Sequence, residues 1–256
     1  MSERQVVSSQ DMRQLDKLTM TTNNITSYQL MEQAAKGLTR YLLDQILDDI
    51  SGLFVIVSGL GNNGGDALLI GRELYQLGVK VSIVLVGAED HQSDDSLQAI
   101  NECQTLDMPM MRVASEEDFS LALEIIESAN VIIDGLFGIG LSRNIEGIFE
   151  SIVLAVNHSY GTVISIDIPS GIHADNGLVM GCAIRANHTL IVQKYKQGNI
   201  LNDALDYNGV THVVDVGIMD KVQEDRQELI SSSFLYTNFP KRMHNSYKYV
   251  YGNVLT

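Results

Sequence analysis

An uninterrupted apolar run, residues 54–57, leads into a segment rich in glycine and asparagine, Gly59–Asp66, and a helical pattern follows at once. This order predicts a buried parallel strand, a tight loop and a helix that begins near Asp66 and ends before Gly78. The four glycines of the segment let backbone N–H groups turn towards a ligand, and the helix dipole favours an anion such as phosphate. The spacing matches neither G-x-G-x-x-G nor a P-loop, so a plain strand-to-helix turn is the competing interpretation.

Predicted strands and helices alternate from this point on. Before it, helical spacing of apolar residues predicts two helices that precede any strand, one capped by Ser8 and Asp11 and one that begins near Thr26. Such an alternation predicts an α/β fold in which helices cover both faces of a mostly parallel sheet, with the two N-terminal helices added to it. We expect one domain over residues 1–220. The predicted strands are 54–58, 79–86, 110–113, 131–134, 162–168, 189–192 and 212–216.

Three of the predicted strands end in polar loops that contain glycine, at 61–66, 134–144 and 167–171. Ligands of open α/β sheets bind at the carboxyl ends of the strands, so we expect these loops to form one site. Taken singly, each residue also has an ordinary role, such as a helix cap or a solvated cation. A carboxylate that ends an apolar strand, however, must find a partner. The candidate residues are Asn62, Asn63, Asp66, Asp134, Ser142, Arg143, Asp167 and Ser170. Oxygen ligands without cysteine or histidine suit a hard cation rather than zinc.

Composition narrows the classes of function. The net charge of −15 argues against a general nucleic-acid surface, although a backbone nest can still bind a phosphorylated small molecule. Cys103 and Cys182 lie far apart and have no nearby histidine, which argues against a disulfide or zinc framework. No apolar run reaches the ~18 residues of a membrane span, and residues 1–10 lack the apolar core of a signal peptide. We therefore expect a cytoplasmic protein with no nucleic-acid or membrane partner.

Three ordered motifs resemble the family of NAD(P)H-hydrate epimerases, the YjeF N-terminal domain. The motifs are Gly59–Asp66, Asp134–Leu141 and Asp167–Gly171, and the resemblance extends from residues 26–37 to 196–198 and 214–218. It implies a three-layer αβα Rossmann-like fold, usually dimeric, that interconverts the R and S forms of hydrated NADH and NADPH. It also implies a potassium ion, with Asn63, Asp134 and Ser170 at the ligand positions. The implied contacts of the hydrate are Asn62, Asn63, Gly64, Gly65, Asp66, Gly138, Ile139, Gly140, Leu141, Ser142, Arg143, Asn144 and Asp167.

The chain departs from the family pattern at four positions. Leu60 and Asn144 stand where proline is common, Ala67 where glycine is frequent, and Ile139 where threonine is common. None of these departures removes a matched carboxylate, asparagine or serine. They affect the stiffness of the loops and the fine contacts of residues 139–144.

The reaction that the resemblance implies inverts a ring carbon that carries a hydroxyl group beside the ring nitrogen. Inversion requires loss of hydroxide or opening of the ring, and both routes need a proton donor and acceptor near that oxygen. Asp167 ends its own predicted strand and is not among the matched metal ligands, so we expect it to lie nearest the reacting centre as the catalytic residue. Lys196 and Arg143 are further candidates, for binding phosphate or for tuning a carboxylate.

Two other classes of function stay open. A hydride-transferring dehydrogenase would share a phosphate loop, but its usual glycine fingerprint is absent. A non-catalytic nucleotide-binding or scaffold module is the stronger alternative, because relatives of this fold serve in messenger-RNA decapping and as secreted lipoprotein partners. The presence of Asp66, Asp134 and Asp167 favours an enzyme.

Residues 221–256 pose a separate question. A polar, charged segment is followed by the short stretch of residues 239–242 and then by the stretch Tyr249–Thr256. This tail resembles the opening of the ADP- or ATP-dependent hydrate dehydratase that is fused to the epimerase in many bacterial members of the family. We expect a linker and the start of a truncated dehydratase domain, with a simple C-terminal strand or tail as the alternative.

Overall fold

The computed structural model of the chain describes residues 5–88, 92–219, 227–230, 232–238 and 244–245. Within these residues, seven strands form one parallel sheet in the order β4-β3-β2-β5-β6-β7-β9. The strands are β2 (Leu53–Ser58), β3 (Lys80–Val86), β4 (Met110–Val113), β5 (Val131–Gly135), β6 (Thr162–Ile166), β7 (His188–Val192) and β9 (Val210–Val214). The predicted α/β class with a mostly parallel sheet is confirmed.

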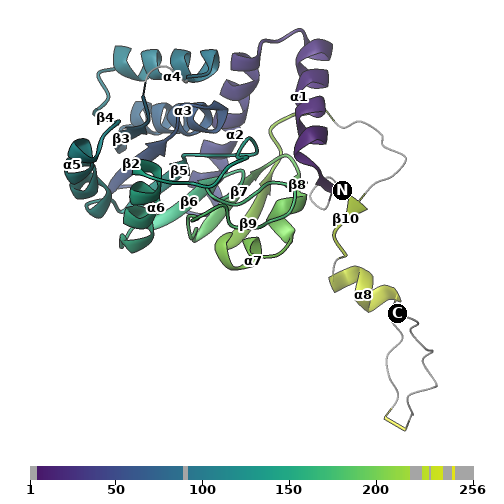
Figure 1. Cartoon of the computed structure of the whole chain (residues 1–256). Coiled ribbons are helices and arrows are strands. Elements are labelled where there is room, and N and C mark those ends of the chain that lie inside the picture. The colour runs from purple at the N-terminus through teal and green to yellow at the C-terminus, as the bar shows by residue number, and fades with distance from the viewer. Residues whose placement is uncertain (1–4, 89–91, 220–226, 231, 239–243, 246–256) are drawn as a thin grey trace.

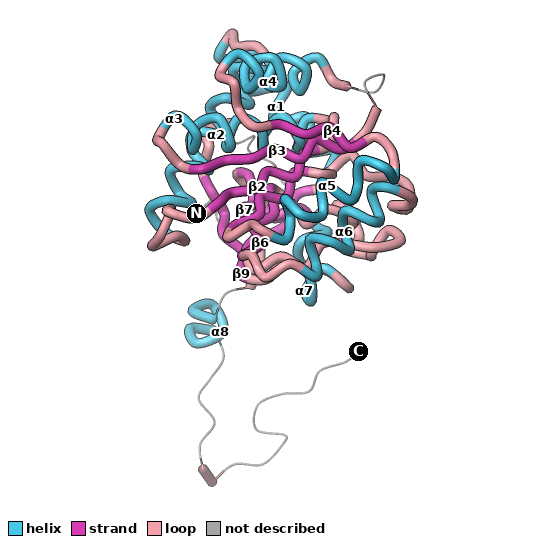
Figure 2. Tube along the Cα trace, turned by 90° about the vertical axis from the view of Figure 1, so that its left-hand side faces the viewer, coloured by secondary structure: helices cyan, strands magenta, loops and turns pink. Residues whose placement is uncertain are grey.

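Helices cover both faces of this sheet (Figures 1 and 2). The first four lie on one face and the next two on the opposite face, where a second cluster of buried apolar residues forms. The helices are α1 (Ser9–Asn23), α2 (Ser27–Gln45), α3 (Asn62–Gln76), α4 (Asp94–Thr105), α5 (Glu116–Glu127) and α6 (Ile148–His158). The three-layer αβα arrangement is therefore also confirmed.

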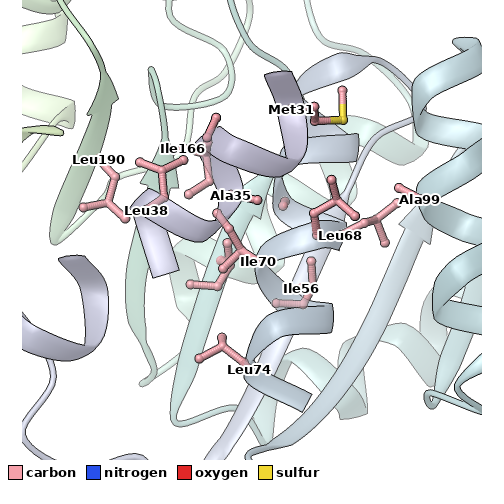
Figure 3. Close-up of a cluster of buried hydrophobic side chains, with 14 of the residues drawn as sticks. Met31, Ala35, Leu38, Ile56, Leu68, Ile70, Leu74, Ala99, Ile166 and Leu190 are labelled. Carbon is pink, nitrogen blue, oxygen red and sulfur yellow. The ribbon is translucent and has the colours of Figure 1, made fainter. Parts of the chain in front are cut away.

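The larger core lies between the sheet and helices α2, α3 and α4 (Figure 3). Leu38 of α2 and Ile56 of β2 are both fully buried in it. Side chains alternate between the two faces of a strand, so Phe54 and Ile56 belong to this core, whereas Val55 and Val57 pack on the side of α5 and α6. Burial on both faces explains why the apolar run of β2 is uninterrupted.

Side-chain caps mark where several helices begin. Ser8 and Asp11 form a reciprocal capping box on α1, and Thr26 and Gln29 form another on α2. Ser115 caps α5 in the same way. Each cap satisfies backbone N–H groups that have no partner within the helix. The predicted starts of the two N-terminal helices are confirmed.

The expectation that two helices precede any strand is wrong. β1 (Gln5–Val7) precedes α1 and joins a second, three-stranded sheet. It pairs in parallel with β8 (Tyr195–Lys196) and antiparallel with β10 (Gln227–Glu228). Three residues are too few for a periodic signal, and the partners of β1 lie at the other end of the described chain. This strand forms because it pairs with distant segments of the chain, not because of its local sequence pattern.

The expected start of the third helix is also wrong, because α3 begins at Asn62 and not near Asp66. Gly64 and Gly65 belong to its first turns and are buried. A Cβ atom on Gly64 would lie 2.0 Å from Gly59 O, and one on Gly65 would lie 2.7 Å from Met31 Sδ. These two glycines let the helix pack closely against its own entry turn and against α2.

Most of residues 221–256 lies outside the described residues, so the expected linker and dehydratase start stay predictions. In the described part, β10 pairs with β1, and α8 (Ser232–Asn238) lies apart from the sheet in both views (Figures 1 and 2). Between β8 and β9 the chain forms the short helices η3 (Gln197–Ile200) and α7 (Ala204–Tyr207). None of the helices in the described ranges is long and apolar enough to cross a bilayer.

Candidate active site

A cavity of about 850 Å³ opens at the carboxyl edge of the parallel sheet. The loops that follow β2 and β5 and the residue that follows β6 line it together, as expected, and α1 and α2 add further walls. The predicted contacts that line it are Asn62, Asn63, Asp66, Gly138, Ile139, Gly140, Leu141, Ser142, Arg143 and Asp167. Gly64, Gly65 and Asn144 are not among the lining residues. The two glycines are buried within α3, and Asn144 is exposed.

The N-terminus of α3 opens into this cavity. Its N-cap residue, Gly61, offers no side chain to the first N–H groups of the helix. Such free N–H groups, together with the helix dipole, bind anions. Arg13 and Arg143 line the same cavity, and Arg13 Nη2 donates to Ile139 O at 3.1 Å. Guanidinium groups pair well with phosphate oxygens, so this part of the cavity suits a phosphorylated ligand.

Asp134 lies near the end of β5 and is fully buried. Its Oδ2 accepts hydrogen bonds from Ser165 Oγ at 2.6 Å and from Ser170 N at 3.0 Å. Its Oδ1 accepts from Ser170 Oγ at 2.5 Å and from Leu136 N at 3.2 Å. Burial raises the pKa of Asp134, and these hydrogen bonds oppose the rise. The partner that this carboxylate was expected to need is therefore a set of hydroxyl and amide groups.

Further oxygen atoms gather beside this carboxylate. Ser170 Oγ lies 3.1 Å from Phe137 O, and Asn63 Nδ2 donates to the same carbonyl at 2.9 Å. The three predicted metal ligands, Asn63, Asp134 and Ser170, thus lie together around the carbonyl of Phe137. Hard cations prefer oxygen ligands of this kind. The residues present fit the potassium ion that the resemblance implies.

Asp167 is held in a strained turn beside a buried lysine. β6 ends at Ile166, before the predicted end, because Asp167 has a φ of 68° and Ile168 N donates to Ile166 O at 2.8 Å. The Asp167 carboxylate forms an ion pair with Lys196 Nζ and accepts from Val192 N at 3.0 Å. Lys196 is fully buried, and of its two predicted roles the structure shows the partnership with a carboxylate. These contacts hold Asp167 in one position at the cavity.

Two further carboxyl groups line the cavity, Asp66 of α3 and Asp16 of α1. Sequence reasoning identified Asp66 and missed Asp16. Burial raises the pKa of Asp16 to about 6, while the Lys196 charge lowers it and the Asp167 charge raises it. Burial also raises the pKa of Asp66 well above its ordinary value, and the charges of Asp167 and Asp16 raise it further. The available signal for Asp16 was a carboxylate at four-residue spacing from Met12 on an otherwise apolar helix face.

Apolar side chains form another part of the lining. They include Leu60, Val86 and Phe149, and the Phe149 ring packs against that of Phe137 with ring centroids 5.2 Å apart. Apolar and aromatic walls of this kind bind the flat rings of small ligands. Sequence reasoning missed these residues, apart from noting Leu60 as a departure, because an apolar residue that lines a cavity looks like any core residue.

Comparison with known proteins places the chain in a family. The model of the YjeF-related protein N-terminus matches residues 27–198. An NAD(P)H-hydrate epimerase of Lentilactobacillus buchneri is 38% identical over 214 residues, which make up 84% of this chain and 95% of the relative. The bifunctional NAD(P)H-hydrate repair enzyme Nnr of Thermofilum pendens is 32% identical over 88% of this chain and 42% of the relative. The crystal structure of yeast ynu0 has the same fold, with a TM-score of 0.65, 22% identity and coverage of 76% of this chain and 82% of that one. The chain belongs to the family of YjeF-related protein N-termini.

Proposed function

We propose that this protein is an NAD(P)H-hydrate epimerase, an isomerase that interconverts the R and S epimers of hydrated NADH and NADPH for the repair of nicotinamide nucleotides. Relatives that match along 84% of this chain bear that name. The observation that carries the proposal is one cavity that joins an open helix N-terminus to three carboxyl groups and a buried lysine. The substrate presents both a pyrophosphate and a hydroxyl-bearing ring carbon, so it requires both kinds of group.

Different groups of the cavity bind the phosphates of the substrate and stabilise the charge on its ring. The N–H groups at the start of α3, with Asn62 and Arg143, bind phosphate oxygens and thereby orient the hydrated ring. Loss of the ring hydroxyl leaves a positive charge shared by the carbon and the ring nitrogen. The Asp167 carboxylate stabilises that charge, and its contacts with Lys196 and Val192 keep it in place while the charge develops.

A potassium ion is part of the proposal. Asn63, Asp134, Ser170 and the carbonyl of Phe137 would hold it, and the support is the convergence of these four groups. A bound ion would supply a positive charge beside the buried Asp134 carboxylate. Contact between the ion and the carbonyl of Phe137 would fix the loop after β5, whose residues 138–143 line the cavity.

The proposal extends to partners. The Nnr relatives are named as bifunctional repair enzymes, and this chain matches less than half of their length. We propose that this protein likewise works with an ADP- or ATP-dependent NAD(P)H-hydrate dehydratase, fused or separate. The homodimer that the resemblance implies belongs to the same proposal.

A coupled absorbance assay tests the function. A dehydratase specific for the S epimer first consumes that form in a mixture of hydrates, until the absorbance of reduced nicotinamide stops rising. Addition of this protein should restart the rise, because the R form is then converted, and the rise should be faster in potassium than in sodium at equal ionic strength. A flat trace in both salts, from protein that melts cooperatively, would leave a non-catalytic nucleotide-binding or scaffold module.

A further inference from the structure

Asp16 lies on the face of α1 that turns towards the cavity. Met12, Asp16 and Met20 follow one another at four-residue spacing, and all three line the cavity. The carboxyl group is thus placed between two apolar side chains. Within the described residues it has no hydrogen bond and no ion pair, although Asp167 and Lys196 line the same cavity.

The carboxyl groups of this region differ in what holds them. Asp134 accepts four hydrogen bonds from protein groups, and Asp167 is paired with Lys196. A proton carrier must release and regain its proton in each cycle, and a carboxylate locked in an ion pair does this poorly. In the described part of the chain, Asp16 has no such contact and stays open to the ligand.

We propose that Asp16 is the catalytic residue that carries the proton to and from the hydroxyl oxygen of the hydrated nicotinamide ring. This inference rests on the epimerase function proposed above. It identifies the proton carrier that the reaction needs in a helix that lies outside the three motif loops.

The route that loses the hydroxyl group begins with a proton transfer from Asp16. Neutral Asp16 donates its proton to the hydroxyl oxygen, the C–O bond breaks with its electron pair, and water leaves. The lone pair of the ring nitrogen forms a C=N bond. Water then adds to the opposite face of the carbon, its electron pair makes the new C–O bond, and the C=N pair returns to nitrogen. The proton that this water releases returns to the Asp16 carboxylate through water in the cavity.

The electrostatics of the cavity support this role. Burial is the main cause that raises the pKa of Asp16 to about 6; Lys196 lowers the pKa and Asp167 raises it. The other charged side chains that line the cavity are Arg13 on α1, Asp66 on α3 and Arg143 in the loop after β5. A group whose pKa is close to the working pH can both give and take a proton.

The test compares wild type, Asp16→Asn and Asp16→Glu in the coupled assay across a range of pH. Asp16→Asn should lower kcat by about 100-fold or more with little change in KM, and Asp16→Glu should keep part of the activity. After subtraction of the uncatalysed reaction, wild-type kcat should fall as the pH rises through the pKa of Asp16, and Asp16→Asn should lose this inflection. Asp44→Asn, at an exposed carboxylate on α2, is the matched control and should keep wild-type kcat.

The outcomes separate the two proposals. An inactive wild type would overturn the epimerase function and this inference with it. An active wild type, beside an Asp16→Asn variant that keeps both kcat and the pH inflection, would overturn the role of Asp16 alone. If Asp16→Asn does not fold, Asp16→Glu decides: a displaced inflection supports the role, and an unchanged profile overturns it.

Discussion

Lys196 is fully buried, and a buried ammonium group is costly unless it is paired. Its Nζ contacts the Asp167 carboxylate and donates to Val192 O at 2.9 Å. This ion pair therefore supports the fold as well as the proposed chemistry. Substitution can separate the two contributions.

Asp167→Asn should lower epimerase activity on the order of 100-fold, because the neutral amide no longer stabilises the positive charge on the ring. It should also lower the free energy of unfolding by about 3 kcal/mol, since the buried Lys196 loses its opposite charge. In the double variant Asp167→Asn/Lys196→Met both charges of the pair are removed, so stability should return while activity stays low. Urea denaturation and the coupled assay measure the two quantities. Recovery of both in the double variant would mean that Asp167 acts through the fold alone.

Asp16 predicts a pH dependence of stability. Its pKa is 3.8 in its ordinary state and about 6 in the folded protein, so the folded state binds more protons between these values. The contribution of the Asp16 carboxyl group to the free energy of unfolding is fully present below a pH of about 4. It is lost as the pH rises through about 6. Asp16→Asn removes that loss, so its melting temperature should exceed that of wild type by a few degrees at a pH of about 8 and approach it near about 4. A lower melting temperature at both pH values would instead point to a structural contact of Asp16.

At the scale of elements, β6 and β7 both end in strained turns at the edge that carries the site. The backbone φ is 68° at Asp167 and 60° at Gln193, where Lys194 N donates to Val192 O at 2.6 Å. Such conformations cost about 1–3 kcal/mol each and persist where surrounding contacts hold them. Gln193 Oε1 accepts from Val216 N at 3.0 Å, which ties one of these turns to the segment after β9. The strain lies where the carboxylate and its lysine are positioned.

The glycines of α3 lead to a prediction about packing. Gly64→Ala should lower the free energy of unfolding by about 1–3 kcal/mol or more, because the new Cβ would meet the backbone oxygen of Gly59 at 2.0 Å. Gly140→Ala is the control, since no atom lies within 4 Å of its added Cβ, and its effect should stay within about 0.5 kcal/mol. The urea midpoint at constant m-value reports both effects. Equal stability of the two variants would contradict the packing role of Gly64.

At the scale of the molecule, the cavity gathers segments from along the whole described chain. α1 supplies Asp16, the loop after β5 supplies Arg143, and β8 supplies Lys196. The net charge of −15 therefore does not describe the site, where two arginines and a lysine lie among the carboxyl groups. Cations gathered at one place can bind an anion within a strongly acidic protein.

A chain shortened to end at Met219 should keep both fold and activity. In the described residues, β10 contacts the body through two residue pairs with β1 and through a hydrogen bond from Gln197 Nε2 to Gln227 Oε1 at 3.2 Å, and residues 234–238 of α8 are exposed. The 214 residues matched in the Lentilactobacillus buchneri relative make up 95% of that protein. Calorimetry should show one cooperative transition within a few degrees of the full chain, and the coupled assay should give similar kcat. Loss of cooperative unfolding would place residues 220–256 within the folding unit.

Much of the architecture could be predicted from the sequence. The apolar run of β2, the caps at Ser8 and Ser115, and the carboxylates that end or follow β5 and β6 are local patterns with local physical causes. From these patterns the parallel sheet and the meeting of the three loops at one edge could be predicted. The start of α3 was misplaced because Gly64 and Gly65 resemble loop residues, although packing against Gly59 and Met31 requires them within a helix.

By itself, the sequence determined the order of strands and helices, the edge at which the site lies and the polar residues of the motif loops that line it, because apolar periodicity, capping and parallel topology follow from neighbours along the chain. Only the tertiary structure decided that α1 brings Asp16 into the cavity, that Lys196 is buried against Asp167, and that β1 pairs with β8 and β10. These features depend on distances between segments far apart in the chain. The burial that raises the pKa of Asp16 exists only once those segments have packed together.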